Sequence, residues 1–116
     1  MDERVEKWLF DIRIAIDEIN SYFENENKNF FSFKDNKMRK RAIERNLEII
    51  GEATNRILAK VPDIQISDAR KIVNLRNLVI HSYDNISDES IWAIIINHLP
   101  VLKKDIDNLM LLIDKE

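Results

Sequence analysis

Residues that interrupt helices are almost absent from this chain. Its 116 residues include one glycine, Gly51, and two prolines, Pro62 and Pro100. A β-sheet protein needs many tight turns, and glycine and proline supply most of them. The scarcity of both residue types therefore favours an all-α fold built from a few long helices.

Length and composition fit one folded domain. Hydrophobic residues make up 45% and charged residues 34% of the sequence, a globular rather than a disordered balance. No apolar run approaches the roughly 20 residues needed to cross a bilayer, and the charged N-terminus, MDERVEKW, lacks a signal peptide's apolar region. Cysteine is absent, which excludes disulfides and thiolate chemistry. We expect a single soluble domain over residues 1–116, located in the cytoplasm.

Apolar residues recur at steps of three and four in the N-terminal half, the period of a helix with one buried face. The first helix is expected from Val5 to Phe23, and the second from Asp35 or Asn36 to Lys60. Between them, three phenylalanines in four residues (FFSF) are expected to pin an otherwise polar loop against the bundle. The expected stripes are Val5, Trp8, Leu9, Ile12, Ile16, Ile19 and Phe23, and then Ile43, Leu47, Ile50, Thr54 and Ile57.

Two serines indicate where a third and a fourth helix begin. Ser67 can cap a third helix that runs to about Ile80, and Ser87 can cap a fourth that continues to Ile113. Pro100 lies inside the fourth helix, and its missing N–H should kink or split that helix. The expected architecture is an up-and-down bundle of four long helices. The stripe of the fourth helix is Ile91, Ile95, Leu99, Leu102, Ile106, Leu109 and Ile113.

The charge is unevenly distributed. The formal net charge of −3 argues against nucleic-acid binding by bulk charge alone. A cluster of cations nevertheless precedes and enters the second helix. Such a run forms either a local basic face or, more commonly, a solvated helix surface. The cations are Lys34, Lys37, Arg39, Lys40, Arg41 and Arg45.

The stretch LRNLVIHSYD places three functional side chains close together in the sequence. Arg76 falls within the apolar stripe of the third helix, where a lone arginine snorkels to water, pairs with a carboxylate or serves an interface. His81 lies about 140° around and about 7.5 Å along an ideal helix from Arg76. The two converge only if the helix ends between them or if a second copy of the chain supplies the partner. Alternatively, His81 is a cation at a helix C-terminus and Tyr83 a loop anchor.

These residues carry a resemblance to a known family. Arg76-Asn77, three apolar residues, His81, one further residue and Tyr83 resemble the signature of HEPN-domain proteins, specifically the HepT-like toxins. Upstream, RAIERNLEIIGEATNRI is similar to the family's second helix. Downstream, IWAIIINHLPVLKKDI is similar to its last helix, which has an internal proline. The likeness covers nearly the whole chain in order.

The resemblance implies a fold, an activity and partners. It implies one HEPN domain that works as a homodimer, and a ribonuclease that is the toxin of a toxin–antitoxin pair. Arg76 and His81 would be catalytic, with Asn77 in support, in a composite cleft between the two copies. The substrate would be an RNA such as a tRNA or an mRNA. The antitoxin would be an MntA-type nucleotidyltransferase that silences the toxin by transferring AMP onto Tyr83.

The chemistry of metal-independent RNA cleavage suits these residue types. The ribose 2′-hydroxyl is the nucleophile, so the protein needs a group that moves protons near neutral pH, such as His81. It also needs a cation such as Arg76 beside the phosphate. With no cysteine and no carboxylate spacing typical of a metal site, we expect neither metal nor cofactor. The remaining histidine, His98, is expected to be a structural residue on the core stripe of the fourth helix.

Two other functions remain open from the sequence. The chain could be a catalytically inactive HEPN module that assists a nucleotidyltransferase partner. It could also be a plain helical dimerisation protein, which explains the apolar stripes but gives the Arg76-to-Tyr83 stretch no purpose.

Overall fold

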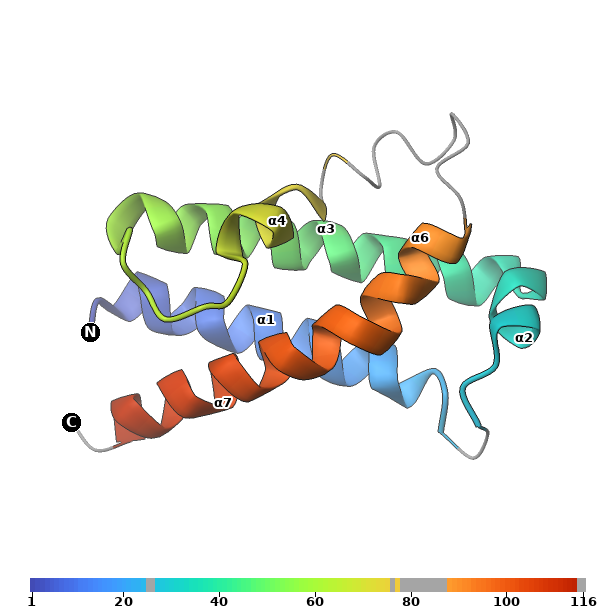
Figure 1. Cartoon of the computed structure of the whole chain (residues 1–116). Helices are drawn as coiled ribbons and strands as arrows, with labels where there is room; N and C mark the ends of the chain where they lie inside the picture. The colour runs from blue at the N-terminus through green and yellow to red at the C-terminus, as the bar shows by residue number, and fades with distance from the viewer. Residues whose placement is uncertain (25–26, 76, 78–87, 115–116) are drawn as a thin grey trace.

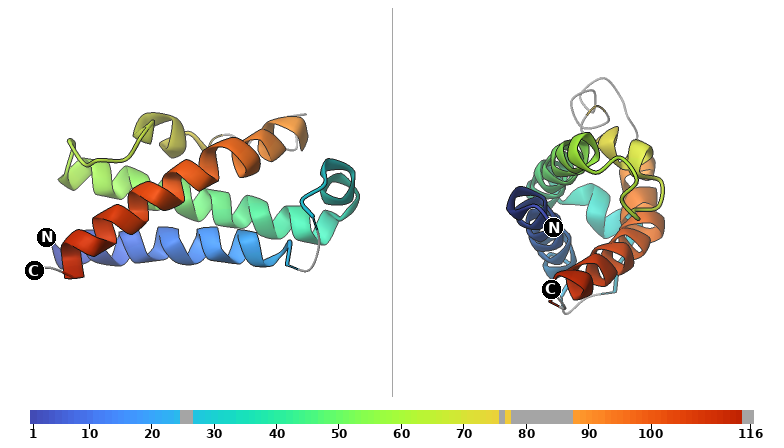
Figure 2. Two further views of the ribbon diagram at one scale, coloured as in Figure 1. Left: turned by 60° about the horizontal axis from the view of Figure 1, so that its bottom comes forward. Right: turned by 90° about the vertical axis from the view of Figure 1, so that its left-hand side faces the viewer.

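The computed structural model describes residues 1–24, 27–75, 77 and 88–114. Within these ranges the chain is helical and contains no strand, which confirms the predicted all-α class. Helices α1 (Glu3–Ser21) and α3 (Lys37–Lys60) run antiparallel, and α7 (Leu99–Asp114) crosses them, so that both termini lie at one end (Figure 1). The end-on view in Figure 2 shows the helices arranged around one centre.

The two long N-terminal helices begin at capping side chains. The Asp2 carboxylate accepts a hydrogen bond from the Arg4 N–H at 2.7 Å, and this bond lowers the pKa of Asp2. The Asn36 side chain accepts from the Arg39 N–H at 2.9 Å. Each cap satisfies a backbone N–H that has no partner inside the helix. The predicted second helix, from Asp35 or Asn36 to Lys60, is confirmed.

The predicted stripes of α1 and α3 form the centre of the core. All of their members are buried except Trp8, which is half-buried. Thr54, the polar member, donates its hydroxyl to the Ile50 carbonyl oxygen at 2.8 Å, so its burial leaves no unpaired group. The fully buried stripe residues of these two helices are Val5, Leu9, Ile12, Ile19, Ile43, Leu47, Ile50, Thr54 and Ile57.

The phenylalanine-rich segment is a short helix, not the predicted loop. Helix α2 (Phe30–Asp35) begins after Asn29, whose side chain accepts the Ser32 N–H at 3.1 Å. Phe33 is fully buried, whereas Phe31 is 72% exposed. The expectation that all three rings pin this segment was therefore wrong for Phe31, because a single helical turn cannot direct three nearby residues inward.

Rings from two helices and from the turn after α1 meet at the end of the molecule near α2. Trp92, in α6 (Asp88–Ala93), has its ring centroid 5.3 Å from that of Phe33 and 5.9 Å from that of Phe23. Phe30 lies 6.2 Å from Trp92. We call Phe23, Phe30, Phe33 and Trp92 the aromatic cluster. It holds α6 against α2 and the turn that follows α1.

The third helix does not begin as predicted. Helix α4 (Ala69–Val73) follows Asp68, whose backbone is left-handed with φ 54° and ψ 35° and whose side chain makes no capping bond. The backbone N–H of Ser67 donates to the Asp105 carboxylate of α7 at 2.9 Å. Ser67 therefore ties this segment to α7 instead of capping α4. Leu75 and Asn77 are also helical, and the predicted continuation to Ile80 lies outside the described residues.

The fourth helix is split, as predicted, but the irregular turn precedes the proline. Between α6 and α7, the segment η2 (Ile94–His98) is π-helical, and the Leu99 N–H donates to the Ile94 carbonyl oxygen, five residues back. Pro100 cannot donate to Ile96, and its ring crowds that carbonyl in a regular α-helix. The wider turn is a known way of accommodating such a break. The stripe from Ile91 to Leu109 is nevertheless buried. The predicted Ser87 cap lies outside the described residues.

Most cations of the basic segment, residues 34–45, form ion pairs or hydrogen bonds with neighbouring residues. Lys40 pairs with Asp88 at 2.9 Å, linking α3 to α6, while Arg41 and Arg45 lie 3.9 and 3.5 Å from Glu44 and Glu48. Arg39 donates to the Tyr22 carbonyl oxygen and the Ser32 hydroxyl, and its guanidinium lies over Phe23. These contacts favour the solvated-surface interpretation over a free basic face. Among the described residues no helix is long and apolar enough to cross a membrane.

Candidate active site

Three of the four predicted site residues lie outside the described part of the chain. Arg76, His81 and Tyr83 belong to the undescribed residues, and the structure therefore neither brings them together nor separates them. Asn77 is described, and it is helical and exposed. Leu75, the residue directly before Arg76, is buried, and Asp88 begins α6 on the other side of the motif.

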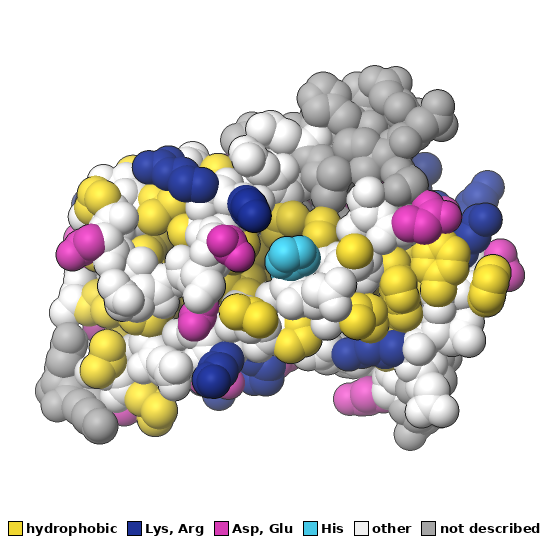
Figure 3. Space-filling model, in the orientation of Figure 1, with side chains coloured by type: hydrophobic (Ala, Val, Ile, Leu, Met, Phe, Trp, Pro, Cys, Tyr) yellow, Lys and Arg dark blue, Asp and Glu magenta, His cyan; other side chains and the backbone are white. Residues whose placement is uncertain are grey.

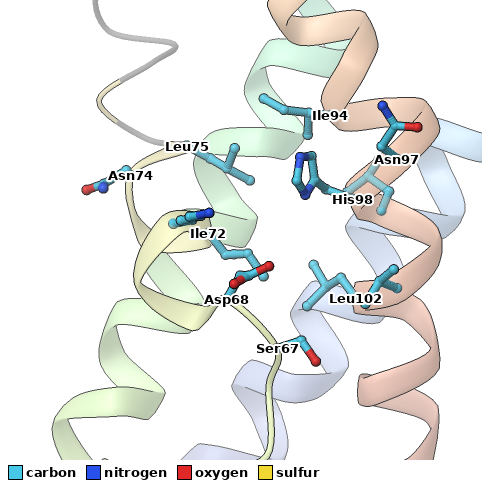
Figure 4. Close-up of a pocket in the computed structure, with 12 residues that line it drawn as sticks. Ser67, Asp68, Ile72, Asn74, Leu75, Ile94, Asn97, His98 and Leu102 are labelled. Carbon is cyan, nitrogen blue, oxygen red and sulfur yellow. The ribbon is translucent and has the colours of Figure 1, made fainter.

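A groove opens on the face beside the start of this motif. Its volume is about 440 Å³, and it lies between α4 on one side and η2 with the start of α7 on the other (Figure 4). We call it the α4–η2 groove. Figure 3 shows hydrophobic side chains in the hollow beside the exposed histidine on this face. The apolar lining is Ile72, Leu75, Ile94, Leu99, Val101 and Leu102, and the polar lining is Ser67, Asp68, Lys71, Asn74, Asn97 and His98.

His98 belongs to this groove and not to the core. Its side chain is exposed, and Figure 4 shows the imidazole extending from η2 into the gap that faces Leu75. The expectation of a structural histidine on the core stripe was therefore wrong. Leu99, the next residue, takes the buried position, and the π turn presents Ile96, Asn97 and His98 outward as consecutive exposed residues.

The polar side chains of the groove have no partner among the residues that the structure describes. Asp68, Lys71, Asn74, Asn97 and His98 make no side-chain hydrogen bond or ion pair with any residue that the structure describes. The basic segment of α3 differs, because Lys40, Arg41 and Arg45 all pair with carboxylates. The groove therefore offers donors, acceptors and one ammonium group to a ligand above an apolar floor. Such a mixture is typical of binding sites.

The described carboxylates and His98 form no metal site. No three His, Asp or Glu side chains among residues 1–24, 27–75, 77 and 88–114 lie close enough together to hold a metal ion. Asp68 is the one described carboxylate that lines the groove, and Asp105 of α7 accepts the Ser67 N–H at 2.9 Å instead.

An all-helical bundle with an Arg–His motif between its third and fourth helices is the arrangement of the HEPN class. The family model described as "Ribonuclease HepT-like" matches residues 12–109, and the chain belongs to this family. The match runs from the middle of α1 through α3 and the motif to most of α7.

Relatives whose names also refer to ribonuclease activity come from Methanocaldococcus jannaschii. The protein named "Putative RNase MJ1380" is 32% identical over 107 residues, which cover 89% of this chain and 94% of that protein. "Putative RNase MJ0127" is 30% identical over 110 residues, or 91% of this chain and 87% of that protein. No solved structure gives a significant match.

The sequence interpretation missed the α4–η2 groove. One signal was present, because His98 lies two residues before Pro100 and a proline inside a helix disturbs the turn that precedes it. That signal predicts an irregular turn, but it does not predict which side chains the turn exposes. The second wall of the groove comes from α4, some 25 residues earlier in the chain, and periodicity does not report such a distance.

Proposed function

We propose that this chain is a metal-independent ribonuclease and the toxin of a toxin–antitoxin pair in the cytoplasm. The observation that carries the proposal is the presence of Arg76, Asn77, His81 and Tyr83 together within the residues matched by the HepT-like ribonuclease family. The names of the archaeal relatives point to the same activity. On this proposal residues 1–116 form one HEPN domain.

In the proposed reaction the RNA supplies its own nucleophile. The ribose 2′-oxygen attacks the adjacent phosphorus, a bond from that oxygen to phosphorus forms, and the bond from phosphorus to the 5′-oxygen breaks. His81 takes the proton of the 2′-hydroxyl, and a protonated imidazole returns one to the departing 5′-oxygen. Arg76 stabilises the negative charge that develops on the phosphate through charge-assisted hydrogen bonds. Asn77 orients the phosphate or the imidazole.

We propose that the working unit is a two-fold homodimer. Arg76 and His81 do not share a face of an ideal helix, and a two-fold axis would bring the residues of both copies into one cleft. A second imidazole in that cleft could supply the proton for the leaving group.

We propose that an MntA-type nucleotidyltransferase silences the enzyme by attaching AMP to Tyr83. Tyr83 lies two residues from His81, so a nucleotide there would be close to the catalytic groups. Its phosphodiester would occupy Arg76, and its nucleoside would hinder the approach of RNA.

The second candidate is an inactive HEPN module that assists a nucleotidyltransferase. The polar lining of the groove favours this candidate, because polar groups around an open groove can bind a ligand without any catalytic role. These groups include Lys71, Asn74 and Asn97. The complete set of Arg76, His81 and Tyr83 favours the enzyme, because a binding module does not need a proton-transfer group beside an arginine.

Incubation of the purified protein with single-stranded RNA and a chelator tests the proposal. We expect cleavage products ending in a cyclic phosphate, and no cleavage of DNA with the same sequence, which lacks the nucleophile. Arg76→Ala and His81→Ala should each reduce the rate by about 10²–10⁴-fold. Lys104→Ala, an exposed change on α7 away from the groove, is the control. An inactive wild type that binds RNA would favour the second candidate.

A further inference from the structure

The roles proposed for the motif residues do not involve the α4–η2 groove. Its wall on α4 ends at Leu75, the residue joined by a peptide bond to Arg76. A ligand in the groove therefore lies beside the beginning of the proposed catalytic motif. The opposite wall carries Asn97 and His98, which the motif does not include.

The size and lining of the groove suit one flat, partly polar ligand. A volume of about 440 Å³ falls within the range of about 300–1,000 Å³ that small-molecule sites occupy. Ile72, Leu75 and Leu102 make an apolar floor, and the His98 ring projects over the gap between the walls (Figure 4). A planar ring can lie on such a floor and stack on the imidazole.

The rim offers both donors and acceptors. The amides of Asn74 and Asn97 each carry two donors and an acceptor, and they lie at the outer edges of opposite walls, pointing away from the gap (Figure 4). Lys71 adds a positive charge that forms no ion pair with a described carboxylate, and Asp68 is the one described acidic side chain that lines the same groove. Asp68 repels a phosphate at its own position but accepts a hydrogen bond from an exocyclic amino group.

We propose that the α4–η2 groove is a nucleobase subsite for single-stranded RNA. This proposal rests on the proposed ribonuclease function. It identifies the part of the substrate, one nucleobase, that the enzyme holds next to the scissile phosphate. One base stacks on His98 over the apolar floor, and the Asp68 carboxylate, which Figure 4 shows turned toward the gap, accepts from an amino group on its edge. Lys71 holds the adjoining backbone phosphate.

Single-stranded RNA fits these features better than a duplex or a protein segment. Bases in a duplex are stacked on one another, whereas those of a single strand can be turned out and stacked on an aromatic or histidine ring. A helix or strand of a partner protein would need a longer apolar groove with few polar groups in it. The polar lining residues here surround one short hollow.

The test measures binding separately from cleavage. The probe is a fluorescent single-stranded oligoribonucleotide with 2′-O-methyl groups, which cannot be cut, and anisotropy gives its Kd. His98→Ala should weaken binding by about 5- to 150-fold, the equivalent of one base–ring stack. His98→Phe keeps a stacking surface but has no titratable nitrogen, and it should recover affinity to within about threefold of the wild type. Lys104→Ala is the control, because Lys104 is exposed on α7 and does not line the groove.

The outcomes separate this inference from the proposed function. If the wild type cuts no RNA, but His98→Ala weakens binding and His98→Phe restores it, the subsite stands and the nuclease proposal fails. If the wild type cuts RNA and His98→Ala binds the probe as well as Lys104→Ala does, the subsite is refuted. The subsite is also refuted if His98→Ala leaves the Kd unchanged but alters the molecular mass by light scattering, because the groove is then a protein interface.

Discussion

Replacing Phe33 should reveal how much the aromatic cluster contributes to stability. Phe33 is fully buried, with its ring centroid 5.3 Å from that of Trp92 and 6.4 Å from that of Phe30. A buried Phe→Ala change typically destabilises a protein by about 3–5 kcal/mol, and aromatic pairs add about 0.5–1.5 kcal/mol beyond area burial. We expect Phe33→Ala to lower the free energy of unfolding by about 4 kcal/mol, a large part of the roughly 5–15 kcal/mol of a typical domain.

The matched control lies two residues away. Phe31 is 72% exposed and its ring pairs with that of Phe30 at 5.7 Å, so Phe31→Ala should change stability by no more than about 1 kcal/mol. Chemical denaturation followed by circular dichroism at the helix band gives the global stability of both variants. For a chain of this length, about 4 kcal/mol corresponds to a fall in Tm of about 15 °C.

Trp92 fluorescence provides a second signal for the same experiment. In a Trp8→Phe background, which leaves Trp92 as the one tryptophan, the emission should shift to longer wavelength in folded Phe33→Ala, because Trp92 contacts Phe33 directly, and stay unchanged in Phe31→Ala. Equal losses of stability in the two variants would refute the reasoning, since burial would then not distinguish these rings.

Three further predictions concern assembly, regulation and surface charge. Light scattering at micromolar concentration should give the mass of a dimer, and an active monomer would contradict the composite site. Co-expression with the nucleotidyltransferase should add AMP to the wild type and none to Tyr83→Phe, which should remain an active nuclease; intact-mass analysis decides, and AMP on another residue would refute the regulatory role of Tyr83. Lys40→Ala removes the pair with Asp88, in which both side chains are just over one-fifth exposed, and should cost about 1 kcal/mol or less. That loss should shrink at high salt in denaturation experiments, and a salt-independent loss would indicate packing by the lysine stem instead.

The helical class and the two long N-terminal helices could be predicted from local sequence patterns. The period of the apolar residues from Val5 to Ile57 is a local property. Asn36 marks the start of α3 through its own side chain, and Pro62 follows its end because proline has no N–H to donate. The motif from Arg76 to Tyr83 could be chosen from sequence as well, because the residue types suit RNA cleavage and resemble a known signature. The arrangement of these side chains in space remains a prediction, since three of them lie outside the described residues.

Which side chains of the less regular segments are buried, and which partners they contact, depends on how the helices pack. Ser67 reads as a helix cap, but Asp105, 38 residues further on, accepts its N–H, and no local pattern contains that partner. Phe31 and Phe33 are chemically identical, and the position of Trp92 decides which ring is buried. His98 has the spacing of a core residue, but the π turn before Pro100 turns it outward into a groove whose other wall is α4. Periodicity describes one helix at a time, whereas a site between two helices depends on how they pack.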